Sequence, residues 1–516
     1  MLRSKGLRTS WVAGLWVAVA GPGCRAQGGA SPDDRPAAEA PVVEAPAPAE
    51  PTPPEPVVDA WWSSGAVVYG VYPPLFGDEP LRGVTARLDE LDALGVDALW
   101  LSPVMQTTDP DDFGYAVTDY LRVRPDYGTE ADLRTLVDEA HARDMKVILD
   151  FVPNHTSVEH PWFSDPRHHD WYVRDEQGQH QHYFDWAHLP NLDYAHPEVA
   201  PTMRAAFEHW MRVHDVDGFR VDAAWGMRQR NPEVWPQLLD DLRNVDPNLW
   251  LLAEASAHDD YYVRSGFDAA YDWTEEIGRW SWDGLFEDLD TIGPRLDLVL
   301  NAGATPPHRV ARFLNNNDTG ERFITRHGPE TTRVAATMLL TLPGIPVLYT
   351  GDEVGAEYLP YDVSKPIAWD DPHALRPHYE KLADLRERLP GLAGPGWTPV
   401  QTDRPSTYAY LRHRADGSDP ALVVLEFGED GGPVVLTFEQ TPGELERRAS
   451  LVDALGETTV VPQWLSSREL RLEMPPSSAR ILLPRPQPAS SSSSSRPRWA
   501  DVELPALAAS LRQLFG

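Results

Sequence analysis

The chain has 516 residues, and its 79 acidic residues against 45 basic ones give a net charge of −34. This charge argues against a nucleic-acid partner and against binding to an anionic membrane surface. The length and a hydrophobic content of 42% allow two or three domains with sizeable cores. The single cysteine excludes an intramolecular disulfide framework.

The amino-terminal stretch has the pattern of an export signal followed by a spacer. Residues 1–24 combine basic residues with a short apolar core that cannot span a bilayer, and they are predicted to be a signal peptide. The four residues ending at Cys24 resemble a bacterial lipobox. The chain is therefore expected either to be lipid-anchored at Cys24 in the bacterial cell envelope or to be secreted after cleavage near Ala26. The Pro/Ala-rich residues 25–60 predict an extended linker.

Residues 61–392 alternate predicted strands with predicted helices. The continuous apolar run at 146–152 indicates a strand buried on both faces, as in a parallel sheet covered by helices. About eight strand–helix units predict a (β/α)8 TIM barrel. A segment at about 155–201, rich in His, Asp and Trp, is predicted to be a small excursion domain after the third strand. Strands are expected at 67–72, 98–101, 146–152, 219–222, 249–253, 312–314 and 346–349, and helices at 81–94, from Thr129 onwards, and at 203–213, 233–242 and 334–342.

The pattern changes after the barrel. Residues 396–484 contain short strands separated by turn residues, which predicts a C-terminal antiparallel β-domain. Residues 485–516 form a Ser/Pro-rich link and a short amphipathic tail, to which no function is assigned.

The stretch from Gly218 to Asp222 alternates apolar and charged residues with period two. This spacing places Arg220 and Asp222 on one face of a short strand. The guanidinium is expected to keep the carboxylate ionised and oriented, as a nucleophilic or metal-binding aspartate requires. A structural ion pair at a strand end is the alternative for these residues taken alone.

Polar residues interrupt several of the other strand ends. In a barrel, the carboxyl ends of the strands carry the chemistry, so Asp222, Glu254 and Asp318 are expected to converge on one mouth. Glu254 ends an apolar run and is predicted to have a raised pKa, which suits a general acid. Asp222, held by Arg220, suits a nucleophile. A separation of roughly 5 Å between the two would be that of a retaining glycosidase.

Over roughly residues 61–484 the chain resembles glycoside hydrolase family 13, the α-amylase family. Seven motifs follow one another in the family's order and at similar spacing. They are Gly70-Val-Tyr-Pro-Pro, Asp150-Phe-Val-Pro-Asn-His155, Leu189-Pro-Asn-Leu-Asp193, Gly218-Phe-Arg-Val-Asp222, Leu252-Ala-Glu254, Phe313-Leu-Asn-Asn-Asn-Asp318 and Gly344-Ile-Pro-Val-Leu-Tyr-Thr-Gly-Asp-Glu353.

The resemblance implies a double displacement on an α-glucosidic bond. Asp222 would attack the anomeric carbon, and Glu254 would protonate the leaving oxygen and later deprotonate the incoming water. Asp318 would bind hydroxyls beside the reacting carbon, His155 would hydrogen-bond a hydroxyl of the same sugar, and Tyr115 would stack on its apolar face. The expected partner is an α-glucan or oligosaccharide.

Three positions depart from the family pattern. Asn317 replaces the usual His before the last Asp and is expected to contribute a neutral amide to substrate binding. Trp225-Gly226 replaces a common Lys-His pair, with Trp225 either stacking on sugar or packing, and Asn191 replaces an Asp that often binds calcium. No metal ligand is therefore predicted, no cofactor is expected to be required, and calcium is expected to be inessential.

The leading hypothesis is an exported enzyme acting on α-1,4-linked glucans or maltooligosaccharides. One alternative keeps the fold but makes the enzyme an exo-acting α-glucosidase or a glucan transglycosylase. Another is a non-catalytic carbohydrate-binding barrel.

Overall fold

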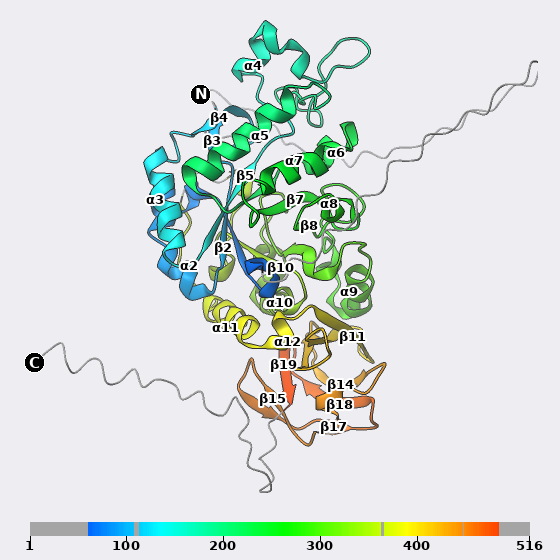
Figure 1. The fold of residues 1–516 in the computed structure, drawn as a ribbon. Helices are drawn as coiled ribbons and strands as arrows, with labels where there is room; N and C mark the ends of the chain where they lie inside the picture. The colour runs from blue at the N-terminus through cyan, green and yellow to red at the C-terminus, as the bar shows by residue number, and fades with distance from the viewer. Residues whose placement is uncertain (1–59, 108–112, 363–365, 447, 485–516) are drawn as a thin grey trace, which may run out of the picture. The chain divides into compact units, whose positions relative to one another are not determined.

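The computed structural model describes residues 60–107, 113–362, 366–446 and 448–484 (Figure 1). The predicted signal peptide with Cys24, most of the predicted linker and the predicted tail lie outside these described residues. Within the described residues, no helix has the length and apolar character needed to cross a membrane.

Eight parallel strands close into a barrel in the order β1-β10-β9-β8-β7-β6-β5-β2, with helices around it (Figure 1). Almost every strand residue is buried, because side chains fill the inside of the barrel and helices cover the outside. This confirms the predicted fold class. The barrel strands are β1 (Val68–Val71), β2 (Ala98–Leu101), β5 (Lys146–Phe151), β6 (Gly218–Val221), β7 (Trp250–Ser256), β8 (Ala269–Tyr271), β9 (Val310–Phe313) and β10 (Ile345–Tyr349).

Helices follow most barrel strands, with bounds that differ in places from the sequence-based ones. The single helix expected at 81–94 is two helices, because the backbone leaves the helical region at Arg87 (φ −107°, ψ 5°), after the weak helix formers Gly83 and Thr85. The helices are α1 (Pro80–Thr85), α2 (Leu88–Leu94), α3 (Glu130–His141), α5 (Val199–His209), α6 (Ala224–Arg230), α7 (Val234–Arg243), α8 (Tyr261–Arg264), α9 (Ile292–Leu300), α10 (Phe323–Thr341), α11 (Arg376–Arg388) and α12 (Pro390–Ala393).

Two insertions reach over the carboxyl ends of the strands. The hairpin of β3 (Met105–Thr107) and β4 (Val117–Val123) follows β2, and its connection carries Tyr115. The segment after β5 contains only one short α-helix, α4 (Pro161–Ser164), and is held largely by turns and isolated bridges, such as the bridge between His155 and Asn191.

The C-terminal domain is a nine-stranded sheet whose observed pairings are antiparallel, in the order β16-β15-β19-β13-β12-β11-β14-β18-β17. It is joined to the barrel by buried polar contacts. Arg412 donates to the carbonyl oxygens of Thr341 (2.5 Å) and Leu392 (2.8 Å). The strands are β11 (Gly396–Thr402), β12 (Thr407–His413), β13 (Ala421–Glu426), β14 (Gly432–Thr437), β15 (Leu451–Asp453), β16 (Thr458–Val460), β17 (Gln463–Trp464), β18 (Glu469–Met474) and β19 (Ser478–Pro484).

Candidate active site

The site is built around the buried guanidinium of Arg220, near the end of β6. Its Nη1 atom donates to Asp150 Oδ1 (2.8 Å) and Asp222 Oδ1 (2.9 Å), and Nη2 lies 2.9 Å from Glu254 Oε1. Register explains the convergence: Arg220 pairs with Asp150 of β5, and Val221 pairs with the residue before Glu254 in β7. The predicted pair of Arg220 and Asp222 is therefore part of a cluster of three carboxyl groups around one cation.

Arg220 is also held from below by the aromatic interior of the barrel. Its guanidinium carbon lies 5.5 Å from the ring centres of both Trp100 and Tyr271, and Nε donates to the Tyr271 hydroxyl at 3.1 Å. A cation stacked on aromatic rings and bonded to several acceptors has few alternative positions. The carboxyl groups that bind Arg220 are therefore fixed relative to one another.

Asp222 and Glu254, the two carboxyl groups assigned to the chemistry, differ in the hydrogen-bond partner of their second oxygen. Glu254 Oε2 accepts from the main-chain nitrogen of Ala223 at 2.6 Å, and Ala223 has a positive φ of 46°, which is uncommon for a non-glycine residue. Asp222 Oδ2 is buried and has no hydrogen-bond partner among the described residues. One oxygen of Asp222 is thus oriented by Arg220, while the other is available to react.

The titration of the cluster departs from the sequence-based expectation. Burial raises the pKa of Asp222 to about 7 in spite of Arg220, and the nearby charge of Asp150 adds to the rise. The expectation that Arg220 keeps Asp222 fully ionised is therefore wrong, because one guanidinium is shared by three carboxyl groups. Burial, with the charges of Asp222 and Asp318, also raises the pKa of Glu254 well above its usual range, as predicted. The three acids around one cation therefore titrate as one coupled group with raised pKa values, which suits a site that needs one protonated acid.

Asp150 is the buried acid that completes the cluster. It accepts from Arg220 and, through Oδ2, from the Tyr115 hydroxyl at 3.1 Å. Burial raises its pKa to about 7. Because both of its oxygens are bonded to side chains that face the mouth, Asp150 orients Arg220 and Tyr115 and has no free oxygen to react with a substrate.

Asp318 lies at the rim and is exposed, unlike Asp222 and Glu254. It accepts from the Tyr361 hydroxyl at 2.7 Å. The buried Asn317 donates to the hydroxyls of both Tyr115 and Tyr361 at 3.1 Å. The charge of Asp318 contributes to the raised pKa values of both buried acids, which places it near them. The three predicted carboxylates therefore do converge.

His155 is buried beside the mouth, where its ring stacks on Tyr183 with centroids 4.8 Å apart. Burial lowers its pKa to about 3, so the imidazole is neutral near neutral pH. Asn154 Nδ2 lies 3.0 Å from His155 Nδ1, whereas Nε2 has no hydrogen-bond partner among the described residues. The Nε2 nitrogen is also buried, and a main-chain hydrogen bond with Tyr115 favours a proton on the ring.

Trp225 lines a cavity of about 770 Å³ and also packs on the excursion segment. Its ring lies 5.9 Å from Tyr183 and 5.5 Å from the exposed Phe184. Tyr261 and His258 line the same cavity. Trp225 therefore packs on the excursion segment and borders a cavity, and its stacking on a sugar stays a prediction.

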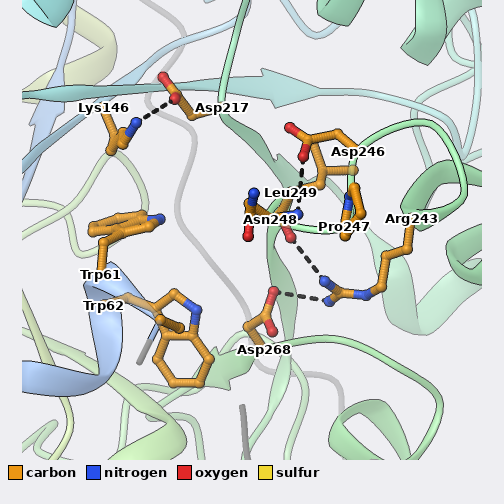
Figure 2. Close-up of a pocket in the computed structure, with 11 residues that line it drawn as sticks. Trp61, Trp62, Lys146, Asp217, Arg243, Asp246, Pro247, Asn248, Leu249 and Asp268 are labelled. Carbon is orange, nitrogen blue, oxygen red and sulfur yellow. Dashed lines mark hydrogen bonds and ion pairs between the residues drawn. The ribbon is translucent and has the colours of Figure 1, made fainter. Parts of the chain in front are cut away.

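A second cavity, of about 470 Å³, lies at the opposite end of the barrel strands (Figure 2). Trp61 and Trp62 line one side, and its charged groups bind one another. Lys146 Nζ lies 2.9 Å from Asp217, and Arg243 Nη2 lies 2.9 Å from Asp268. Lys146 and Arg243 in this cavity are each paired with an aspartate, unlike the three acids that share Arg220.

The residues that a family resemblance associates with calcium do not fit that ion. Asn154 Oδ1 accepts from Arg230 Nη2 at 2.6 Å, and Asn191 Oδ1 accepts from Asn154 Nδ2 at 3.1 Å. Both side-chain oxygens are thus already bonded to donors, and calcium needs six to eight oxygens. Across the described part of the chain, no group of three or more His, Cys, Asp or Glu residues could hold a metal ion.

Tyr361 and Arg230 are among the residues of this region that sequence reasoning missed. Tyr361 follows β10 on a short turn, and nothing in its local sequence distinguishes it from a surface tyrosine; it is 55% exposed. Arg230 is the last residue of α6, where a basic residue is common, so its sequence position does not indicate a role in the site. Their roles depend on contacts across 43 and 76 residues of chain, respectively.

Comparison with known proteins shows that this chain is similar to α-amylases. A family model described as "Alpha amylase, catalytic domain" matches residues 64–248. The chain is 32% identical to the alpha-amylase MalA of Haloarcula japonica over 72% of its own length and 56% of that protein. It thus spans little more than half of this relative. It is also 26% identical to Alpha-amylase 3 of Dictyoglomus thermophilum, over 68% of this chain and 82% of that one.

This chain is also similar to solved structures of α-amylases. The alpha-amylase of Geobacillus thermoleovorans, solved in complex with acarbose, aligns with a TM-score of 0.69 and 26% identity. The alignment covers 83% of this chain and all of that one. The shared architecture therefore includes both the barrel and the C-terminal sheet.

Proposed function

This chain belongs to the α-amylase family, glycoside hydrolase family 13, and from that premise we propose that it is a retaining glycoside hydrolase of α-glucosidic bonds. Its substrates are α-1,4-linked starch-type glucans or maltooligosaccharides. The observation that carries this proposal is the arrangement of Asp222 and Glu254 on adjacent nitrogens of the Arg220 guanidinium. Such an arrangement suits the separation of about 5 Å at which retaining enzymes hold their two carboxyl groups.

In the first step, Asp222 Oδ2 attacks the anomeric carbon as the bond to the leaving oxygen breaks. Glu254, kept protonated by burial, gives its proton to that oxygen. This forms a covalent glycosyl ester on Asp222. In the second step, Glu254 removes a proton from water, which attacks the same carbon and releases Asp222. Arg220 stays bound to both acids and stabilises whichever of them carries the charge.

Other groups at the mouth bind the sugar whose bond is cleaved. Asp318 is exposed at the rim and accepts hydrogen bonds from its hydroxyls, with Tyr361 and Asn317 holding that edge. Tyr115 is half-buried over Arg220, with its ring centre 5.9 Å from the guanidinium carbon, and it offers its face to the sugar ring. His155 donates to a hydroxyl of the same sugar.

The test is release of reducing sugar from starch and maltooligosaccharides by the wild type and by Asp222→Asn. The variant keeps the size of the side chain but loses the nucleophilic oxygen. Equal rates in the two proteins would overturn the proposal. Carbohydrate binding without turnover by the wild type would instead support the non-catalytic alternative.

Endo action on long chains is favoured over exo action by the cavity beside Trp225. It is lined by Trp225 and by Ser256, two residues after Glu254, and its volume of about 770 Å³ has room for further sugar units. Trp225→Ala is expected to raise KM for maltoheptaose more than for maltotriose. The product profile on maltoheptaose separates hydrolysis from transglycosylation, and an exo-acting enzyme would release a single small product from the start.

Export to the cell envelope or to the medium completes the proposal. The signal-like residues 1–24 and the lone Cys24 support it. In a bacterial host, metabolic labelling with a fatty-acid analogue should tag the wild type but not Cys24→Ser. A cleaved, unlabelled protein in the medium would favour simple secretion over anchoring.

A further inference from the structure

Arg230, on the last turn of α6, is a cation outside the catalytic cluster whose charge acts on His155. Its Nη2 atom donates to Asn154 Oδ1 at 2.6 Å and lies 3.5 Å from the main-chain oxygen of the same residue. Burial lowers the pKa of Arg230 to about 10, so it still carries its charge at neutral pH. The side chain of Asn154 is completely buried. A charged donor therefore engages a buried amide directly beside the mouth.

This contact determines which way the Asn154 amide points. Arginine has only donors, so the atom facing Arg230 must be the amide oxygen. The amide nitrogen is thereby turned toward His155 Nδ1 at 3.0 Å and Asn191 Oδ1 at 3.1 Å. Its two hydrogens match these two acceptors. The amide is fully bonded in this orientation, whereas a flipped amide would set two donors against each other at Arg230.

The orientation of the amide in turn selects the tautomer of His155. An amide nitrogen can only donate, so His155 Nδ1 must accept and cannot carry a proton. A neutral imidazole then carries its proton on Nε2. We propose that Arg230 is a positioning residue that fixes the Nε2–H tautomer of His155 through Asn154, and that its guanidinium serves in this chain in place of a metal ion at this position.

Gly226 makes room for this arrangement. A Cβ atom on Gly226 would lie 2.7 Å from Asn154 Oδ1 and 3.3 Å from Arg230 Nη1, closer than side chains normally approach. The position that departs from the family pattern is thus the one over which Arg230 reaches Asn154. Gly226 and Arg230 lie one helical turn apart on α6, so one short helix supplies both the cation and the space.

The consequence for the reaction rests on the proposed function. A His155 that carries its proton on Nε2 donates to a sugar hydroxyl, whereas the other tautomer offers only an acceptor there. Asp318 nearby already supplies acceptor oxygens to the same sugar. The site therefore has a donor on one side and acceptors on the other, which suits hydroxyl groups that do both.

The direct test is nitrogen NMR of histidine-labelled full-length protein, in which the protonated and unprotonated ring nitrogens have well-separated shifts. The His155 signals are assigned by their loss in His155→Gln. In the wild type we expect an unprotonated Nδ1 and a protonated Nε2. In Arg230→Ala we expect a mixture of tautomers, because the amide is free to flip. An unchanged Nε2–H tautomer in Arg230→Ala would overturn the proposal.

Asn154→Asp separates the positioning role from a merely structural one. The carboxylate keeps, and strengthens, the contact with Arg230 but cannot donate to His155 Nδ1. We expect a melting temperature at or above that of the wild type, a protonated Nδ1, and a rise of about tenfold in KM for maltooligosaccharides with a smaller change in kcat. A wild-type KM in this variant would overturn the proposal.

Three further variants complete the design. Arg230→Lys should partly restore the wild-type tautomer, and Gly226→Ala should disturb it as Arg230→Ala does. Arg212→Ala removes an exposed arginine bonded to Glu208 and should change neither the tautomer nor KM. Exhaustive chelation should leave the wild-type melting temperature and tautomer unchanged, and a fall in melting temperature that calcium reverses would overturn the replacement of the metal. The expected tautomers in a protein without glucan hydrolysis would uphold this inference and refute the proposed function.

Discussion

The two ends of strand β6 carry aspartates with opposite environments. Asp217, just before the strand, is bonded by His141 (2.7 Å), Lys146 (2.9 Å) and the main-chain nitrogen of Val147 (2.8 Å). Asp222, just after it, shares one guanidinium with two other acids and has a buried oxygen without a partner among the described residues. Each aspartate has a cation at 2.9 Å, so the presence of an ion pair does not distinguish them.

The distinction lies in the number of donors per carboxylate. Burial raises the pKa of Asp217, but the bonds from His141, Val147 and Lys146 outweigh it and lower the pKa overall. At Asp222 burial dominates and the pKa rises to about 7. A carboxylate bonded by several hydrogen-bond donors, such as Asp217, stabilises the fold. A buried carboxylate with too few donors, such as Asp222, stays reactive and lowers the stability of the fold.

The largest effect is expected at the acid that holds the proton. Glu254→Gln should lower kcat on maltooligosaccharides by about 10² to 10⁴-fold, because an amide cannot protonate the leaving oxygen. A nitrophenyl glucoside, whose leaving group needs little protonation, should lose much less in the first step. Steady-state and burst kinetics on both substrates measure this difference.

A matched control for this variant lies in the C-terminal sheet. Glu426 is also fully buried and accepts from the Thr407 hydroxyl at 2.6 Å. Glu426→Gln should lower the melting temperature and leave kcat unchanged. A Glu254→Gln enzyme with wild-type kcat on maltooligosaccharides would remove Glu254 from the chemistry.

The next effect concerns stability and should have opposite signs at the two ends of β6. Asp217→Asn should lower the free energy of unfolding by about 1–3 kcal/mol, because it breaks bonds to charged partners. Asp222→Asn should leave it unchanged or raise it at pH 8, because one of several crowded buried charges is removed. Denaturant unfolding of both variants measures the two changes in the free energy of unfolding. The same sign at both positions would contradict the comparison.

Stability should also respond to pH differently at the two positions. The folded pKa of Asp222, about 7, lies above the unfolded value of about 3.9, so the folded state binds the extra proton and its stability falls as pH rises between these values. Asp217 has a lowered pKa, so its contribution is present above pH 4 and is lost as pH falls through the folded pKa.

Unfolding measured from pH 3 to pH 8 tests this assignment. Asp222→Asn should reduce the loss of stability between about pH 4 and pH 7, whereas Asp217→Asn should change the profile only below about pH 4. A profile of Asp222→Asn that runs parallel to the wild type across this range would show that Asp222 titrates normally.

The smallest effect is expected at the rim. Tyr361→Phe removes the hydroxyl that donates to Asp318 and should change KM by about 2 to 10-fold, the equivalent of one hydrogen bond. Tyr358→Phe is the matched control, since its hydroxyl donates to the main-chain oxygen of Thr350 at 2.7 Å. That variant should change the melting temperature and leave KM unaltered.

Much of this arrangement could be predicted from sequence because barrel strands have a simple signature. Apolar runs predict seven of the eight strands, and polar residues at several of the strand ends predict the acids of the site. The missed strand, β8, is Ala269–Tyr271, and its three residues are too few to show a periodic pattern. Its Tyr271 nevertheless holds Arg220, so a short strand carries part of the site.

Other features depend on how many charged groups lie around one side chain in the folded protein. A sequence shows that Arg220 faces Asp222, but it does not show that Asp150 and Glu254 share the same guanidinium. The raised pKa of Asp222 follows from burial and from this crowding of acids. Tyr361 and Arg230 reach the site from a turn and a helix end, where propensity and periodicity indicate only surface positions.

The contact between Arg230 and Asn154 has a consequence for where the protein can work. A diffusible ion leaves its site when the surroundings are dilute or contain competing ligands, whereas a side chain on the same polypeptide keeps a constant local concentration. The proposed export would bring this protein into media whose ionic composition the cell does not control. With its cation encoded in the gene, the protein would keep the same His155 environment in each of them.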